Sequence, residues 1–125
     1  MILFDTSIWI EFLKGSQGIS GLAQFHLEQR NVFAFECVFG ELLQGTKNKR
    51  EKGIILGFWD NLPRINQQNI WIEAGEYAMA NKTFSKGVGL IDVAILMAAR
   101  KESAQVWTLD KKLKAILKTS DIFPA

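Results

Sequence analysis

The sequence predicts an α/β fold with a small parallel sheet flanked by helices. Short apolar runs typical of buried strands alternate with helical patterns, and this alternation favours parallel strands joined by helices. The runs 1–4 and 105–109 are each followed by an acidic residue, Asp5 and Asp110, at the point where a helix begins. A carboxylate at such a switch points out of the carboxyl edge of the sheet, where open α/β proteins hold their ligands.

The elements of the first half follow from apolar patterns and helix breakers. A strand near 1–5 precedes helices over 7–14 and 19–30, and a second strand lies near 32–35. Helices follow near 37–45 and 49–61. The second of these ends at Leu62-Pro63, because proline disfavours a helical conformation in the residue before it.

The second half continues the same alternation. A weak strand is expected near 64–66, followed by long helices over 69–85 and 90–103. A strand over 105–109 leads into a helix over 110–118, and a last strand is expected near 121–123. Gly15, Gly45 and Gly87 stand where helices end, as the left-handed cap position prefers.

Composition limits the class of protein. The chain has 125 residues, of which 48% are hydrophobic, so we expect one folded domain over 1–125 and exclude a disordered chain. No apolar run approaches the roughly 18 to 20 residues of a membrane span, and Asp5 argues against a secretory signal. The single Cys37 fits a reducing cytoplasm. A net charge of +2 is too small to indicate a nucleic-acid binder by itself.

Two further acids are set against apolar segments. Asp92 shares a helical stripe with Ile95, Leu96 and Ala99, so its carboxylate points toward the core side. An unpaired charge there costs on the order of several kcal/mol, unless it caps free amides of the first turn or binds a cation. Glu41 projects away from the centre of its own apolar stripe and faces a cleft or water.

Acids brought together in this way favour a hard divalent cation. A carboxylate cluster without His or Cys suits Mg²⁺ or Mn²⁺ better than zinc. One or two such ions can activate a water for in-line displacement at a phosphodiester. The hydroxyls of Thr6, Ser7 and Thr108 are expected to orient metal-bound waters. The sequence therefore predicts a metal-dependent nuclease.

Four motifs resemble those of PIN-domain ribonucleases. The opening Ile2-Leu3-Phe4-Asp5-Thr6-Ser7-Ile8-Trp9 is similar to the first motif, and Glu41-Leu42-Leu43-Gln44-Gly45 to the second. Gly89-Leu90-Ile91-Asp92 with Ala98-Ala99 resembles the third, and Trp107-Thr108-Leu109-Asp110 the fourth. Their order and spacing cover essentially the whole chain and are most similar to the VapC-type toxins of bacterial toxin–antitoxin pairs. The fourth motif departs at Leu109, where many relatives carry a polar Asn or a second Asp.

The resemblance implies a three-layer α/β/α fold with a small twisted parallel sheet. It implies RNA cleavage that depends on Mg²⁺ or Mn²⁺, a homodimer, and inhibition by a small antitoxin protein. Asp5, Glu41, Asp92 and Asp110 would be the catalytic acids and metal ligands. Because of the departure at Leu109, we expect Asp110 to complete or orient the site through water.

Other interpretations compete with this one. Asp5 and Asp110 also suit helix N-caps, Asp92 a helix-dipole partner, and Glu41 a solvated position. The protein would then be a catalytically silent binding module with a structural ion. A phosphotransferase using Asp5 as nucleophile would want a second Asp two residues on, where Ser7 stands.

Several residues near the motifs have ordinary structural explanations. His26 suits a half-buried structural position, Glu11 and Glu36 suit the surface, and Trp9 and Phe12 suit the core better than a base-stacking edge. The lysines of the last helix line one solvated face: Lys111, Lys112, Lys114 and Lys118. The run 47–52 is the stronger candidate for contact with RNA phosphates.

Overall fold

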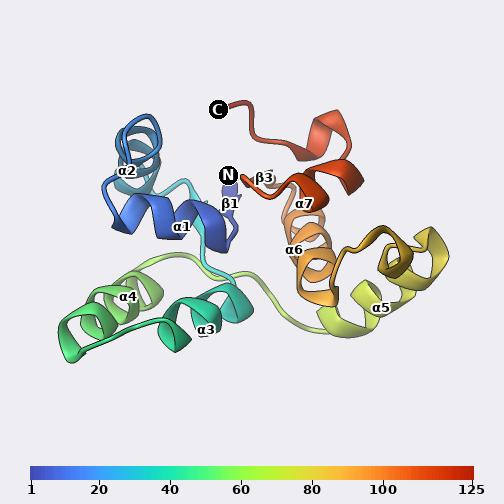
Figure 1. Ribbon diagram of the computed structural model, residues 1–125, viewed down its shortest axis with the longest axis horizontal. Helices are drawn as coiled ribbons and strands as arrows, with labels where there is room; N and C mark the ends of the chain where they lie inside the picture. Colours follow the sequence, from blue (N-terminus) through green and yellow to red (C-terminus); the bar gives the residue numbers. More distant parts are fainter.

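The computed structural model describes residues 1–125 and has a three-stranded parallel sheet. The strands are β1 (Ile2–Phe4), β2 (Val32–Phe33) and β3 (Gln105–Trp107), in the order β2-β1-β3. Leu3 pairs with Phe33 on one side and with Val106 on the other. β1 is therefore central, and all three of its residues are buried because helices cover both faces of the sheet (Figure 1). The predicted α/β class is confirmed.

Four helices form the first half of the chain. They are α1 (Thr6–Leu13), α2 (Ser20–Glu28), α3 (Glu36–Gln44) and α4 (Lys49–Asn61). Trp9 on α1 is 1% exposed, and its ring centroid lies 5.4 Å from that of Phe4 on β1. Phe39 on α3 and Phe58 on α4 approach the same ring at 5.1 and 5.2 Å. This aromatic cluster joins α1, α3 and α4 to the sheet, which confirms Trp9 as a core residue.

The second half supplies α5 (Ile70–Asn81), α6 (Leu90–Lys101) and α7 (Lys111–Ile116), with short 3₁₀ turns η1 (Phe84–Lys86) and η2 (Thr119–Asp121). α6 carries six buried residues and packs against α5, β1 and β3. In Figure 1 the pair α5 and α6 lies on the opposite side of the sheet from α1 and α2. The arrangement is the helix–sheet–helix layering that the resemblance implies.

Three expected elements differ from the structure. The helix expected over 69–85 ends at Asn81, because Lys82 takes a left-handed conformation with φ 54°. The strand expected near 64–66 is a single bridge between Ala34 and Arg64, formed by the two hydrogen bonds that Ala34 makes with Pro63 and Ile65. The strand expected near 121–123 is likewise one bridge, between Val106 and Ile122, preceded by η2.

Two of the three glycines act as predicted. Gly15 and Gly87 have φ of 72° and 77°, the left-handed conformation that favours glycine after a helical turn. Gly45 is the C-cap of α3, so the helix ends there as predicted, but its φ of −85° is right-handed and not left-handed.

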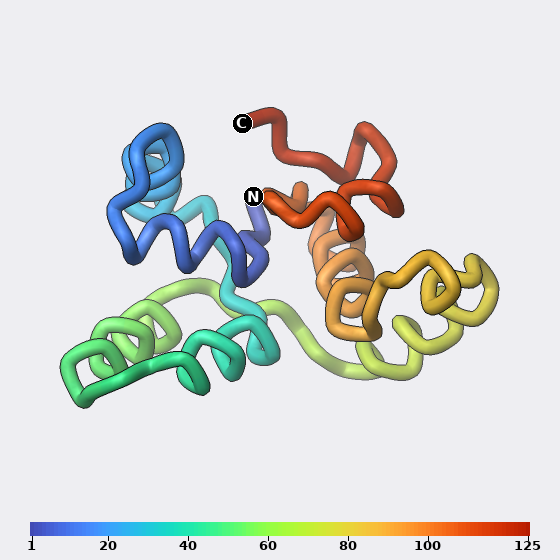
Figure 2. Tube along the Cα trace, viewed as in Figure 1, coloured from blue at the N-terminus to red at the C-terminus, as the bar shows by residue number.

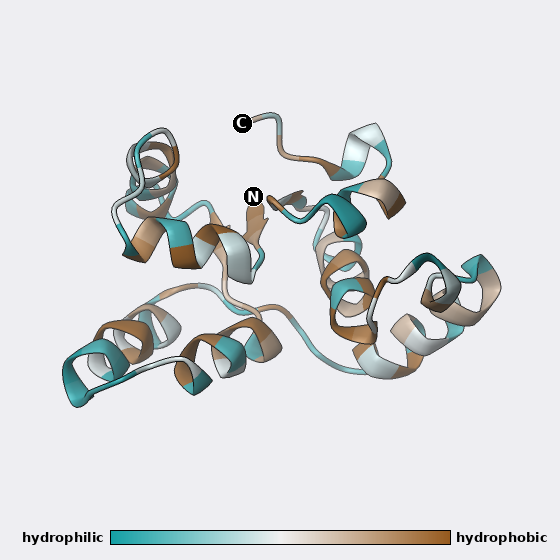
Figure 3. Ribbon diagram, in the orientation of Figure 1, coloured by the Kyte–Doolittle hydropathy of each residue, from teal (hydrophilic) through white to brown (hydrophobic).

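The sheet joins both ends of the chain. The N–H of Gln105 donates to Met1 at 3.1 Å, and the N–H of Phe123 donates to Val106 at 2.9 Å, so β3 holds both termini (Figure 2). Hydrophobic residues gather on the strands and the helix faces turned toward them, and the turn between α3 and α4 is hydrophilic (Figure 3). None of the seven α-helices combines the length and the hydrophobicity that a membrane-spanning helix needs.

Candidate active site

Asp5 and Asp110 follow neighbouring strands of the sheet. Asp5 comes directly after β1, and its N–H donates to the carbonyl of Trp107 at 3.1 Å, so the two strand ends are adjacent. Asp110 begins α7 three residues after β3 ends. The structure thus brings together two acids that are 105 positions apart in the chain, at the carboxyl edge of the sheet.

Asp5 is buried, with 5% of its surface exposed. Its Oδ1 accepts hydrogen bonds from Ser7 Oγ at 2.5 Å and from the N–H of Ile8 at 3.1 Å, the second of which caps α1. Its Oδ2 accepts a hydrogen bond from Thr108 Oγ1. Burial raises the pKa of Asp5, and these hydrogen bonds oppose the rise because they favour the carboxylate.

The two hydroxyls beside Asp5 have their protons directed at it. Ser7 Oγ accepts a hydrogen bond from the N–H of Leu109 at 3.0 Å, and Thr108 Oγ1 accepts one from the N–H of Asp110 at 2.9 Å. Each hydroxyl accepts from the loop before α7 and donates to Asp5. Both hydroxyl protons are therefore used on the carboxylate, and the orientation of metal-bound waters by these hydroxyls stays a prediction. Oδ2, with one donor against two on Oδ1, is the oxygen with room for a cation.

Glu41 is exposed on α3 and is held from another element. Thr6 Oγ1, in the first turn of α1, donates to Glu41 Oε1 at 2.7 Å. The exposed position agrees with the helical projection, which turned this residue away from its apolar stripe. The hydrogen bond from Thr6, 35 positions earlier, points the carboxylate toward the start of α1, where Asp5 lies.

Asp110 is the N-cap of α7. Its Oδ1 accepts hydrogen bonds from the N–H groups of Lys112 at 2.8 Å and Leu113 at 3.4 Å. The capping interpretation is therefore correct for Asp110, as it is for Asp5. Capping occupies one oxygen of Asp110 and leaves Oδ2 without a protein donor.

Asp92 is the acid whose charge is least compensated. It is half-buried in the first turn of α6, and its pKa is raised to about 6 by burial and then by repulsion from Asp110, Asp5 and Glu41. None of these four carboxylates forms a salt bridge with a basic side chain. The four acids therefore share one region and repel one another there, although no three converge closely enough to hold an ion in this arrangement.

The donor set fits a hard divalent cation. Four carboxylates without a balancing Lys or Arg leave negative charge that Mg²⁺ or Mn²⁺ would neutralise. Asp5 is fixed by its three hydrogen bonds, whereas the exposed Glu41 must turn to join it. Neither Cys nor His competes as a ligand: Cys37, near Glu41 and Asp92, has a pKa raised to about 12 by burial and by the Glu41 charge, which keeps its thiol protonated.

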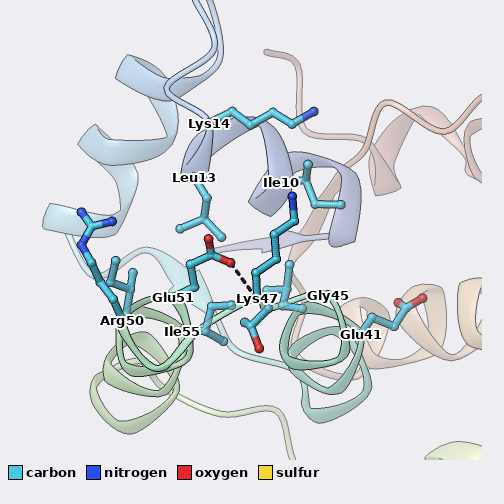
Figure 4. Close-up of a pocket in the computed structure, with 12 residues that line it drawn as sticks. Ile10, Leu13, Lys14, Glu41, Gly45, Lys47, Arg50, Glu51 and Ile55 are labelled. Carbon is cyan, nitrogen blue, oxygen red and sulfur yellow. Dashed lines mark hydrogen bonds between the residues drawn. The ribbon is translucent and has the colours of Figure 1, made fainter.

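A groove of about 530 Å³ begins beside Glu41 and runs between α1, α3 and α4 (Figure 4). Its apolar lining includes Ile10, Leu13 and Ile54, each 40% exposed. The groove is therefore an accessible hollow that opens next to one of the four acids.

Basic side chains border the same groove: Lys14, Lys47 and Arg50. Glu51, in the first turn of α4, lies among them, and its Oε1 accepts a hydrogen bond from the N–H of Lys47 at 2.9 Å (Figure 4). The contact of the 47–52 run with RNA remains a prediction, and the structure places two of its basic residues on a groove that reaches Glu41.

Three other residues considered in the sequence analysis make contacts that explain them without a role in the acidic site. His26 is half-buried with its ring against Phe123, at 5.3 Å between centroids. Glu36 is exposed and accepts a hydrogen bond from Gln67 at 2.8 Å. Glu11 accepts a hydrogen bond from Ser16 and lies 4.0 Å from Lys14. None of the three belongs to the acidic site.

The fold and the position of the acids define an α/β protein with an acidic site at the carboxyl edge of its parallel sheet. Residues 2–118 match the PIN domain family, and the chain belongs to that family. The resemblance drawn from the four motifs is thereby confirmed.

Two relatives and one solved structure cover nearly the whole chain. Ribonuclease VapC32 from two strains of Mycobacterium tuberculosis is 29% identical, over 98% of this chain and 94% of the relative. The crystal structure of FitAcB from Neisseria gonorrhoeae superimposes with a TM-score of 0.58 at 21% identity, over 98% of this chain and 94% of that chain. The structural likeness supports the fold, and the likeness to VapC32 supports the VapC-type group within the family.

Proposed function

We propose that this protein is a metal-dependent endoribonuclease and acts as the toxin of a toxin–antitoxin pair. One observation carries the proposal: four carboxylates from separate segments share one edge of the fold without a basic side chain to balance them. An arrangement that repels itself persists where a bound cation or substrate offsets the repulsion. The likeness to Ribonuclease VapC32 supports RNA as the substrate.

The four acids have different tasks in this proposal. Asp5, held rigidly by Ser7 and Thr108, and Asp92, at the start of α6, hold the cation. Glu41 joins them from α3, and Asp110 orients water from the start of α7. A bound Mg²⁺ or Mn²⁺ supplies water activation and charge stabilisation at the phosphodiester. No side-chain base is required.

The proposal includes partners and location. VapC-type toxins, which the motifs resemble, act in bacterial pairs with a small antitoxin. We therefore propose a cognate antitoxin protein, a homodimer and a cytoplasmic location. The exposed apolar side chains Ile72, Met79 and Phe84, which are 66 to 89% exposed, offer surface for such association.

The test is cleavage of total cellular RNA with Mg²⁺, Mn²⁺ or EDTA, using wild-type protein, Asp5→Asn, and Asp60→Asn as a matched control. Asp60 is an exposed acid at the end of α4, paired only at 3.8 Å with Arg64. We expect metal-dependent cleavage by wild type and Asp60→Asn and none by Asp5→Asn. Absence of metal-dependent cleavage by folded wild-type protein would favour the silent binding module, and cleavage by Asp5→Asn at the wild-type rate would overturn the proposed site.

A further inference from the structure

The lysines of α7 are not equivalent, although the sequence predicts one solvated face for them. Lys111, Lys112 and Lys114 are all exposed. Lys112 extends toward Gly87, in the loop before α6. A β-carbon on Gly87 would lie 3.5 Å from Lys112 Nζ and 3.7 Å from its Cδ and Cε. The side chain of Lys112 thus passes the α-carbon of Gly87 at a distance that would be ordinary van der Waals contact for a β-carbon.

Both ends of this contact are fixed by the backbone. The N–H of Lys112 donates to Asp110 Oδ1 at 2.8 Å, in the cap of α7. Gly87 takes a left-handed conformation, φ 77°, two residues before Gly89, the N-cap of α6. Lys112 therefore bridges the starts of the two helices that carry Asp110 and Asp92.

The ammonium group of Lys112 has no protein acceptor. It forms neither a salt bridge nor a hydrogen bond. The backbone of Lys112 is bound to Asp110, while its ammonium group is left without a partner in the protein. A lysine whose chain is already packed loses less side-chain freedom when its ammonium binds an anion.

We propose that Lys112 binds an RNA phosphate adjacent to the one that is cut, and so positions the strand over the acids. The inference rests on the proposed ribonuclease function. An RNA strand approaching four carboxylates is repelled, and a cation that binds a neighbouring phosphate of the strand offsets part of that repulsion. Lys112 lies in the first turn of α7, two residues after Asp110, while the groove with Lys47 and Arg50 opens on the α3–α4 side. A strand crossing the acids thus meets positive charge on both borders.

The test compares Lys112→Gln with Lys111→Gln and Lys114→Gln on the same helix. With a short single-stranded RNA and saturating Mg²⁺, Lys112→Gln is expected to raise KM about fivefold to tenfold at unchanged kcat. The slope of log kcat/KM against log salt concentration should become shallower by about 0.7, because one phosphate contact is lost. The two controls stay within about twofold of wild type, since solvated lysines away from the strand contribute little. Lys112→Arg, which keeps the charge, restores KM.

A separate measurement removes metal from the comparison. Fluorescence anisotropy of the same RNA in EDTA should show weaker binding to Lys112→Gln than to Lys111→Gln. If wild type cuts RNA but Lys112→Gln has the KM of Lys111→Gln, this inference is wrong and the ribonuclease function stands. If wild type cuts no RNA, the proposed function itself fails and this inference fails with it.

Discussion

Thr108 donates a hydrogen bond to Asp5 across 103 positions of sequence, and both side chains are buried. The same hydroxyl accepts the N–H of Asp110 at 2.9 Å, so one side chain connects the acid that follows β1 to the acid that begins α7. Thr108 binds Oδ2, the oxygen of Asp5 that has only one donor and therefore room for a cation. This relationship makes Thr108 a positioning residue whose removal can be tested separately from the acids.

Thr108→Val is expected to lower RNA cleavage about 10- to 100-fold, the usual cost of losing a group that orients a ligand. The free energy of unfolding should fall by about 1 to 3 kcal/mol, because a buried carboxylate loses a donor. Cleavage assays and urea unfolding measure the two effects.

The chain offers a matched control in Thr83→Val. Thr83 is 1% exposed, and its hydroxyl has no hydrogen-bond partner. Replacing it should leave cleavage unchanged and leave stability equal or higher by up to about 1 kcal/mol. Wild-type activity in Thr108→Val would show that Asp5 needs no support from this hydroxyl.

Thr6→Val removes the hydrogen bond that holds Glu41. Glu41 is exposed, so stability should change by less than about 0.5 kcal/mol. The affinity for Mn²⁺, measured by calorimetry, should nevertheless fall about 10-fold, because the carboxylate must be ordered on binding. Thr46→Val, at a hydroxyl that bonds the carbonyl of Leu43, serves as control. Equal Mn²⁺ affinity in Thr6→Val and wild type would remove Thr6 from the site.

Asp92→Asn tests the repulsion among the acids. The pKa of Asp92 is raised from 3.8 to about 6, so its ionisation costs the folded state stability above pH 6 and costs nothing below about pH 4. Without metal, the variant should be more stable than wild type by about 1 kcal/mol at pH 8, a value reduced for solvent screening, and equal to it near pH 4. Urea unfolding at both pH values measures this, with Asp60→Asn as the exposed control.

Metal addition should reverse that order at pH 8. Mg²⁺ at a hundredfold excess over Kd stabilises a binding protein by about 2.7 kcal/mol, and Asp92→Asn should lose this response. A wild-type melting curve indifferent to both Mg²⁺ and Mn²⁺ would count against the metal site.

Much of the fold could be predicted because it depends on local pattern. The alternation of apolar runs with helical patterns predicts the strands and the acids at their ends. Helix-breaking residues near the helix ends predict where α4 lies. The end of α5 could not be predicted, because Lys82 is not a residue type that favours the left-handed conformation. The sequence predicts strands at the two single bridges because apolar residues stand there. In the structure these segments form only one bridge each and do not continue the sheet.

The side-chain hydrogen bonds of the candidate site could not be predicted from the sequence. The pairs Thr6–Glu41 and Thr108–Asp5 join segments 35 and 103 positions apart, and no periodicity relates them. The contact of Lys112 with Gly87 depends on a missing side chain and on the direction of one lysine. No sequence motif indicates the ion pair between Arg100 and Asp121, which lie 2.8 Å apart.

That ion pair supports stability rather than the site. The hydrogen bond from Arg100 lowers the pKa of Asp121, although burial alone would raise it. The pair therefore stabilises the fold at pH values above the ordinary pKa of 3.8. This stabilisation is lost as the pH falls through the lower pKa that Asp121 has in the folded state. Asp121→Asn should destabilise the protein by about 1 to 3 kcal/mol at pH 7, since Lys118 N–H loses part of its acceptor as well. RNA cleavage by the folded variant at low temperature should equal that of wild type. A selective loss of cleavage would place η2 in the function.

The last prediction ranks Asp110 against Asp5. Both donors to Asp110 reach a single oxygen, Oδ1, and Asn keeps such an oxygen, so Asp110→Asn should still cap α7 and remain folded. If Asp110 orients water, the variant should retain partial cleavage, reduced about 10- to 100-fold and recoverable at higher Mn²⁺. Asp5→Asn, by contrast, replaces one oxygen of a buried carboxylate to which Ser7 and Thr108 both donate hydrogen bonds. This variant should show no cleavage at any Mn²⁺ concentration. Titration of both variants with Mn²⁺ in one cleavage assay separates them. Complete inactivity of folded Asp110→Asn at every Mn²⁺ concentration would make Asp110 a direct ligand, equal in role to Asp5.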